Sequence, residues 1–375
     1  MNLESSVEHT SRKRYHHYVS QFYLRNFAND SLKRKIGVYV NNYNSFHDSV
    51  PIRHQAKAKN FYYHDEVEGG LSKIESEFSK IIKQITINDC LPTQQSEEWI
   101  LLILFIAVSA LRTFKYVEYY QNQAKAIVEN INKLSVYSNS NKEQLNIVLK
   151  QPFSLWALEA SFQMAFYLSN MNICLLINKH DEQLITSDDP VVLYNQYLEK
   201  RKHYGGITGI ATRGLQLYMP LSPRLALLLY DGDIYMIRKM QNNVALLKNS
   251  EDIDEFNRLT CANSDKCLYY STLTGNYKKT IKKMKKRVKM KEKIEILKES
   301  GETRENGARL FRREGSKRGN DRSTLLIGIK DSLKIKLNPK CIVERKRAAS
   351  KYEEGKLNIR GEHSILKKMW EELQI

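Results

Sequence analysis

Hydrophobic residues recur at helical spacing through the first half of the chain. Between residues 71 and 85 the apolar positions fall three or four apart, which predicts an amphipathic helix. Residues 99–111 carry no charge and predict a buried helix, whose pattern extends over residues 97–134. A joint rich in serine and asparagine precedes a third helix, expected near residues 145–168. The sequence therefore predicts an α-rich middle region.

Short apolar blocks punctuated by Asp, Pro and Gly replace this pattern after residue 169. Such blocks are typical of strands in a mostly antiparallel sheet. They cover residues 171–178, 183–194, 214–223 and 224–237. A closing helix and a last strand are expected within residues 251–272, so the body should end near Thr274.

The front of the chain adds a short helix and a strand. Val19, Tyr23 and Phe27 recur four residues apart, which predicts a short helix that Ser20 could cap. The β-branched run KIGVYV at residues 35–40 predicts a strand. The predicted fold class is therefore α+β: an N-terminal helix and strand, an α-rich middle, and a mostly antiparallel sheet in the C-terminal half of the body.

Positive charge is concentrated in the last quarter of the chain. Residues 278–375 hold 30 Lys and Arg against 14 Asp and Glu, which is +16 of the formal net charge of +18. We therefore expect a single body over residues 14–274 and a basic appendage over residues 275–375. Such a segment attracts polyanions by releasing counterions, and RNA, DNA or an anionic membrane surface could each be the partner. The alternative is a solvated charged appendage with no specific partner.

The appendage is expected to begin with an amphipathic helix. Its apolar stripe consists of Ile281, Met284 and Val288, and lysine coats the remaining surface. The cations expected to contact phosphate there are Lys282, Lys285, Lys286 and Arg287. Polar residues 299–323 predict a flexible linker, and residues 324–375 predict a hairpin and a final amphipathic helix.

The stretch HHYVSQFYLRNF at residues 16–27 resembles the N-terminal block of a bacterial family catalogued as domain of unknown function 4238. Ser20 stands where the family usually carries proline. Similar blocks are SALRTF (109–114), TSDDP (186–190), MPLSP (219–223) and FNRLTCANS (256–264). The resemblance covers residues 14–274 and implies a shared body but no particular activity. Bacterial families of this kind often serve in defence or toxicity.

His16 and His17 are the first candidates for chemistry. On a helix or at its entry the two side chains diverge by about 100°, so one would face a cleft as a metal ligand or a general acid or base. Alternatively, one donates to a backbone carbonyl and the other packs against Tyr18 or Tyr23. Gln21 and Arg25 lie four apart and could together hold a phosphate or carboxylate, unless the arginine pairs with a nearby acid.

Asp188 and Asp189 are the second candidates, in the sequence TSDDP at the end of a predicted strand. Two carboxylates with the hydroxyls of Thr186 and Ser187 offer oxygen ligands suited to Mg²⁺ or Mn²⁺. Metal-assisted cleavage of phosphodiesters uses such ligands. The alternative is turn chemistry, in which these side chains bond nearby backbone amides ahead of Pro190.

Glu75, Glu77 and Arg112 form the third set. Glu75 lies at the edge of the apolar face of its helix, and Arg112 follows a long uncharged run, so each needs a partner of opposite charge. An internal ion pair is one interpretation. A catalytic acid beside a guanidinium that binds phosphate is the other.

Several enzyme classes lack their signatures in this chain. We find no P-loop, no GxSxG, no HExxH and no CxxC motif. The five cysteines are scattered, which favours reduced thiols. Residues 99–111 are short for a membrane span, which needs about 20 residues. No apolar export segment follows the first charges, so a cytoplasmic location is expected.

Two functions remain open from the sequence. One is a metal-dependent nuclease, or a related phosphodiester-cleaving enzyme acting as a toxin or defence effector, with the basic tail capturing nucleic acid. Its ligands or general base would come from His16 or His17, Glu75, Asp188 and Asp189, and its phosphate contacts from Arg25 and Arg112. The other is a non-catalytic module that binds nucleic acid or protein, with the tail as its docking segment.

Overall fold

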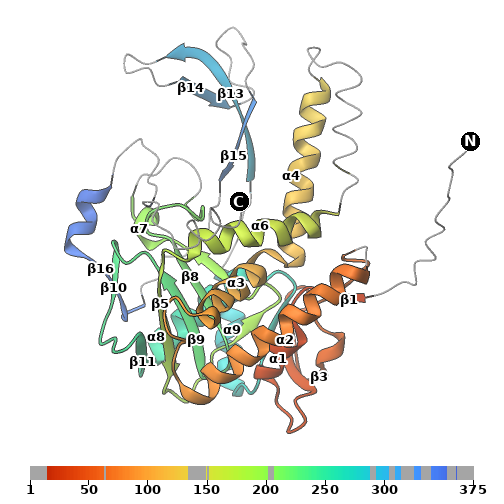
Figure 1. The fold of residues 1–375 in the computed structure, drawn as a ribbon, viewed down its shortest axis with the longest axis vertical. Coiled ribbons are helices and arrows are strands. Elements are labelled where there is room, and N and C mark those ends of the chain that lie inside the picture. The colour runs from red at the N-terminus through yellow and green to blue at the C-terminus, as the bar shows by residue number, and fades with distance from the viewer. Residues whose placement is uncertain are drawn as a thin grey trace, which may run out of the picture.

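Five strands from the second half of the body form the central sheet (Figure 1). The computed structural model describes residues 15–62, 65–133, 149, 152–201, 207–287, 293–303, 309–313, 325–330, 339–352 and 360. In spatial order the strands are β11 (Val244–Leu247), β5 (Asn172–Asn178), β9 (Leu225–Tyr230), β8 (Gln216–Pro220) and β7 (Val192–Tyr194). Only the β11–β5 pair is parallel. The predicted α+β fold with a mostly antiparallel sheet is confirmed.

Both faces of this sheet are buried. Leu175 of β5 belongs to the hydrophobic cluster that includes helix α3 (Glu97–Leu111), whereas its neighbour Leu176 belongs to the cluster of helix α8 (Ser250–Asn263). Successive residues of a strand point to opposite faces, so a strand covered on both sides needs apolar residues at every position. This explains why the strands have continuous apolar sequences.

A second sheet joins the front of the chain to the end of the body. Its order is β3 (Ser45–Pro51), β2 (Lys35–Val40), β12 (Cys267–Tyr270) and β6 (Thr186–Ser187), all antiparallel. The predicted strand at residues 35–40 is therefore confirmed as β2. A further short strand, β1 (Tyr15–His17), pairs antiparallel with β4 (Lys57–Lys59).

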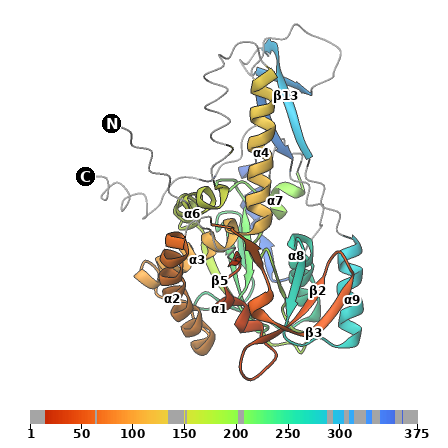
Figure 2. The same ribbon diagram turned by 90° about the vertical axis from the view of Figure 1, so that its right-hand side faces the viewer.

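Where the structure describes the middle region, its long helices are α2 (Asp65–Asn88), α3, α4 (Phe114–Lys133) and α6 (Phe153–Leu168). The single helix expected over residues 97–134 is wrong, because the chain bends by 59° between α3 and α4. Ser96 caps α3, since its hydroxyl accepts a hydrogen bond from the Trp99 amide at 3.2 Å. Figures 1 and 2 show α4 extending away from the body.

Within the described ranges, no single helix is both long enough and apolar enough to span a membrane. The bent pair Glu97–Leu111 and Phe114–Asn122 satisfies both criteria only when its two helices are taken together. The expected beginning of the third helix near residue 145 lies outside the described residues.

Short helices complete the body. The predicted N-terminal helix is present as α1 (Gln21–Leu24), followed by a 3-10 turn, η1 (Arg25–Phe27). Tyr23 and Phe27 are buried as the spacing predicts. The remaining short elements are η2 (Ile52–His54), α7 (Gln196–Glu199) and η3 (Lys346–Lys351).

Part of the basic C-terminal region packs on the body. Helix α9 (Gly275–Arg287) buries Ile281 and Met284 in a cluster with β12. Strand β16 (Ile342–Glu344) pairs with β10 (Tyr235–Ile237), and Ala348 is fully buried. Hydrophobic contacts therefore cross the predicted boundary after residue 274.

The flexible linker predicted at residues 299–323 is partly wrong. Strand β13 (Lys293–Thr303) continues into this range, and β14 (Arg309–Arg313) lies within it. Both belong to a three-stranded sheet with β15 (Leu325–Lys330). The pairing of backbone groups between strands overrides the polar composition here. Val288, the second strand of the predicted hairpin and the final helix lie outside the described residues.

Candidate functional site

A pocket of about 580 Å³ lies between the N-terminal segment and helix α2. It is lined by His17, Gln21, Phe22, Arg25, Tyr62, Leu71, Ser72, Glu75, Ser76, Ser79, Lys80, Lys83 and Arg112. The structure thus brings together five of the residues that the sequence analysis selected, from three separate parts of the chain. Apart from His17, the lining carries four cations and one carboxylate, so the pocket is complementary to an anion.

His17 is held in one orientation and one tautomer. Its Nδ1 lies 3.0 Å from the carbonyl oxygen of Gln55, which can only accept, so Nδ1 carries the proton and donates. Burial lowers the pKa of His17, and the charge of Lys57 adds to this effect. At neutral pH the ring is therefore uncharged and Nε2 carries a lone pair. Within the described residues, Nε2 has no hydrogen-bond partner.

His16 has a different role. The two histidines lie on strand β1 rather than on a helix, so their side chains point to opposite faces instead of diverging by about 100°. His16 is 3% exposed, and its Nδ1 accepts a hydrogen bond from the Tyr62 amide at 3.3 Å. Its ring also packs against the Tyr62 ring, with centroids 5.7 Å apart. His16 is thus a core residue, and its aromatic neighbour is neither of the two that the sequence suggested.

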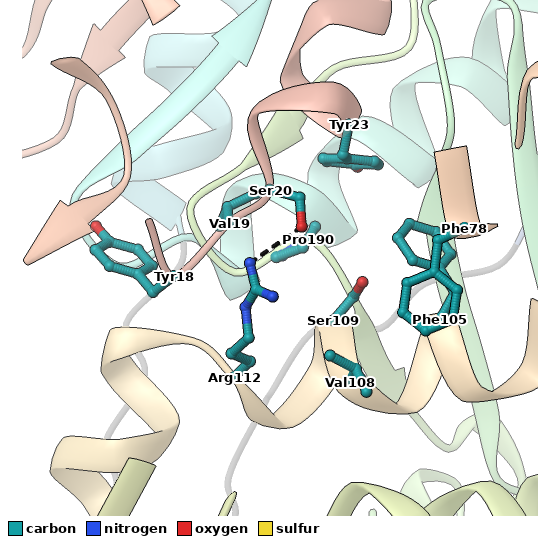
Figure 3. A pocket seen from close by; sticks show the side chains of 10 residues that line it. All are labelled: Tyr18, Val19, Ser20, Tyr23, Phe78, Phe105, Val108, Ser109, Arg112 and Pro190. Atoms are coloured by element: carbon teal, nitrogen blue, oxygen red, sulfur yellow. Dashed lines mark hydrogen bonds between the residues drawn. The ribbon is translucent and has the colours of Figure 1, made fainter. Parts of the chain in front are cut away.

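Glu75 and Arg112 form the internal ion pair that was one of the two interpretations. Arg112 Nη1 lies 2.6 Å from Glu75 Oε1, and its side chain is 4% exposed. Ser20 joins the pair, since its hydroxyl donates to Glu75 Oε1 at 2.7 Å. The same hydroxyl accepts a hydrogen bond from Arg112 Nη2 at 3.0 Å (Figure 3). The Ser20 hydroxyl therefore does not cap helix α1. Arg112 also donates to the carbonyl oxygen of His17, which links the pair to the histidine.

Further cations come from the two sides of the pocket. Arg25 and Gln21 line it together, as their spacing predicts. Lys80 and Lys83 of α2 were missed, although they lie four residues beyond the lining residues Ser76 and Ser79, respectively. Glu77 does not line the pocket and instead pairs with Lys80 at 2.7 Å on the exposed surface. The signal that could have identified the two lysines is the series of three- and four-residue steps along the face of α2 that carries Glu75.

Asp188 and Asp189 do not line this pocket, which corrects the expectation that they meet the histidines there. The Asp188 carboxylate accepts hydrogen bonds from the backbone amides of Asp265 at 3.0 Å and Lys266 at 2.7 Å. Burial raises its pKa to about 7, although the amides oppose this shift. Asp189 pairs with Lys115 at 3.2 Å, and burial raises its pKa as well.

The TSDDP segment instead shows the predicted turn chemistry. The Ser187 hydroxyl donates to the carbonyl oxygen of Asp189 and accepts from its amide. A separate small cavity of about 10 Å³ is lined by Pro190 of this segment together with Ser20 and Arg112, among others (Figure 3). The aspartate side chains therefore act within the core and its turn rather than at the pocket.

The predicted phosphate contacts on α9 are also separate from the pocket. Figure 2 shows α2 and α9 on opposite sides of the molecule. Lys282 is exposed and lies 5.7 Å from the centroid of the Phe46 ring. Lys285 is largely buried and donates to Ser264 Oγ and to the carbonyl oxygen of Cys261, both at 2.8 Å. Burial lowers its pKa. The side chains of Lys286 and Arg287 lie outside the described part of the structure.

Metal-binding groups were sought across the described residues. None of these residues forms a group of three or more His, Cys, Asp and Glu side chains that could hold a metal ion. Of the His, Cys, Asp and Glu side chains, the pocket itself is lined by His17 and Glu75.

The family comparison agrees with the resemblance of the N-terminal block. The model of a family described as protein of unknown function (DUF4238) matches residues 15–274. No curated protein and no solved structure matches the chain. The matched range contains every residue that lines the pocket and also the aspartate turn. Because the match covers more than half of the chain, the protein belongs to the DUF4238 family.

Proposed function

We propose that the protein acts on nucleic acid and cleaves phosphodiester bonds in the pocket at His17, with His17 as the general base. The observation that carries this proposal is the orientation of the imidazole. Its Nδ1 is anchored on the Gln55 carbonyl, its Nε2 is unprotonated, and it lies in a pocket with an excess of cations. Attack on a phosphate requires an unprotonated base and a surrounding positive field, and the pocket provides both.

The chemical step follows from these groups. His17 Nε2 takes the proton from a hydroxyl or water as its oxygen attacks phosphorus. Arg25, Lys80 and Lys83 stabilise the negative charge on the phosphoryl oxygens. The bond to the leaving oxygen then breaks, and that oxygen takes a proton from solvent. Arg112 remains neutralised by Glu75 and positions the His17 backbone.

A requirement for Mg²⁺ or Mn²⁺ remains a proposal. A divalent ion in the pocket would take Glu75 as its protein ligand and would complete its shell with water and phosphate oxygens, which leaves His17 Nε2 available as the base. We do not assign an ion to Asp188 and Asp189, since their carboxylates are engaged by backbone amides and by Lys115.

The test is cleavage of labelled RNA and DNA pools by the full chain, with Mg²⁺, with Mn²⁺ and with EDTA. His17→Ala should reduce the rate by about 100-fold or more, the usual contribution of a general base. His47→Ala is the matched control, because His47 is exposed and lies on β3, away from the pocket. Circular dichroism would verify that both variants fold.

Two outcomes would redirect the proposal. Cleavage at the wild-type rate by folded His17→Ala would remove this pocket as the reaction centre. Tight binding without any cleavage would favour the non-catalytic binding module. A role as a toxin or defence effector follows from the proposed activity, and growth arrest on expression should then depend on His17.

A further inference from the structure

The two-stranded sheet of β1 and β4 has two chemically different faces. Residues paired across antiparallel strands point to the same face, and Tyr15 pairs with Lys59 while His17 pairs with Lys57. The intervening His16 points to the opposite face and is buried. The outer face of this sheet therefore carries Tyr15, His17, Lys57 and Lys59 side by side, and His17 opens into the pocket.

Tyr15 is the most accessible group of this outer face. Its side chain is 58% exposed, although burial of a tyrosine ring is favourable. The Lys57 ammonium lies 4.8 Å from the centroid of its ring, close enough for a cation–π contact. Lys59 is exposed beside it. An open aromatic ring between two lysines has the composition of a surface that binds a nucleotide chain.

Resting on the proposed function, we infer that the outer face of β1–β4 binds single-stranded nucleic acid next to the reacting phosphate. Tyr15 stacks on a base, and Lys57 and Lys59 contact the backbone phosphates. Tyr15 and His17 are two residues apart on a strand, a separation of about 6.7 Å. This is comparable with the step between neighbouring nucleotides in an extended strand, so the stacked base belongs to the nucleotide beside the one that is cleaved.

The stacking mode determines which form of nucleic acid fits. A ring on a protein surface can stack only on a base that has left its own stack, as bases of a single strand or a loop do. Bases of a duplex present only their edges, so a duplex would make backbone contacts alone. The substrate class is therefore single-stranded RNA or DNA.

Binding measured without cleavage tests this inference separately from the proposed function. The probes are one labelled oligonucleotide as RNA, the same sequence as DNA, and the duplex, at physiological ionic strength. We expect at least one single strand to bind more tightly than the duplex. Tyr15→Ala should raise its Kd about tenfold, whereas Tyr15→Phe, which keeps the ring, should stay within about twofold. Tyr43→Ala is the matched control, since Tyr43 is 81% exposed but lies on the β2–β3 turn.

The contribution of the two lysines is measured by the salt dependence of binding. Lys57→Gln with Lys59→Gln should reduce the slope of log K against log salt by about 1 to 2, as expected for one or two lost phosphate contacts. Equal Kd for Tyr15→Ala and wild type, or a duplex bound as tightly as either single strand, would overturn the inference. Strand binding that depends on Tyr15 without cleavage would sustain it while the proposed activity failed. Cleavage that depends on His17, with no effect of Tyr15→Ala on Kd, would support the proposed activity and overturn the inference about Tyr15.

Discussion

Two ion pairs lie on either side of the bend between α3 and α4, and they differ in how accessible their carboxylates are. Glu75 pairs with Arg112 at the pocket, and Asp189 pairs with Lys115 beside the TSDDP segment. The exposed fractions of the acids are 26% and 10%. Each pair removes charge from water and offsets that cost with its partner. By residue type alone, both could belong to an active site.

The difference lies in what remains open around each pair. At the aspartates, two backbone amides occupy the Asp188 carboxylate, and a lysine and the Thr113 hydroxyl bind Asp189. At the pocket, Ser20 and Arg112 both bind Oε1 of Glu75, and in the described residues no hydrogen-bond partner is found for Oε2. Of these two regions, as far as the structure describes them, it is the pocket that presents a carboxylate oxygen without a hydrogen-bond partner.

The largest expected effect tests whether ionisation of the buried Asp188 carboxyl lowers the free energy of unfolding at neutral pH. Its pKa is raised to about 7 in the folded protein, so between about pH 4 and pH 7 the folded state holds a proton that the unfolded state has released. Stability should therefore fall as pH rises through this window. Asp188→Asn lacks this titration. The difference in unfolding free energy between the variant and wild type should therefore shift by about 4 kcal/mol in favour of the variant from pH 4 to pH 8, at about 1.4 kcal/mol for each pKa unit.

Urea denaturation across this pH range measures the effect. The variant also changes hydrogen bonds to the Asp265 and Lys266 amides, but that change is independent of pH and does not alter the slope. Asp181→Asn, which removes an exposed carboxylate, is the matched control. Parallel pH profiles for wild type and Asp188→Asn would show that Asp188 is ionised throughout, and the contrast between the two regions would then weaken.

A smaller effect is expected from breaking the pair at the pocket. Arg112→Met leaves the Glu75 carboxylate half-buried without its cation, which should cost about 3 kcal/mol of unfolding free energy. The double variant Arg112→Met with Glu75→Gln should recover most of this loss, because the uncompensated charge is gone. Urea denaturation at pH 7 gives both values, with Arg34→Met as the control for an exposed arginine.

The recovery is the informative part of this cycle. If the double variant were as unstable as Arg112→Met, the hydrogen bonds of Arg112 to Ser20 and to the His17 carbonyl would account for the loss. The guanidinium would then stabilise the fold mainly by its hydrogen bonds to the N-terminal segment rather than by its charge interaction with Glu75.

Local physics accounts for what could be predicted from sequence. Apolar spacing identified the helices around Ile81 and Leu102, and the cost of burying charge predicted the pair of Glu75 with Arg112. The helix α2 was expected to begin at Leu71, but it begins at Asp65 and includes Gly69 and Gly70, which are exposed and lower the helix propensity without ending the helix. The helices depend on residues that are neighbours along the chain, and the ion pair depends on the cost of burying a charge, so both can be inferred from residue types and their spacing.

Long-range backbone contacts account for what was missed. The partners of Asp188 are the amides of Asp265 and Lys266, which lie 77 and 78 residues further along the chain. Every residue except proline has such an amide, so no residue type marks it. Strand β1 is three residues long and is defined by pairing with β4, and so short a segment shows no period. The histidines were therefore expected on a helix.

Ser20 gives the smallest expected effect and the finest test of the pocket. Its hydroxyl bonds Glu75 and Arg112, so Ser20→Ala should cost about 1 kcal/mol. Ser20→Pro loses the same hydroxyl, but φ at this position is −60°, the angle that a proline ring fixes. The ring restricts the unfolded chain and should return about 0.4–1 kcal/mol.

The proline variant should therefore be more stable than the alanine variant by thermal denaturation, and it restores the residue that the family block usually carries. A proline variant less stable than alanine would mean that the Ser20 amide or the conformation of Val19 matters more than φ. Because proline cannot bond Glu75 or Arg112, the proline variant would hold the ion pair without a hydroxyl. A proline variant at least as stable as alanine would therefore show that the pair of Glu75 with Arg112 does not depend on the Ser20 hydroxyl.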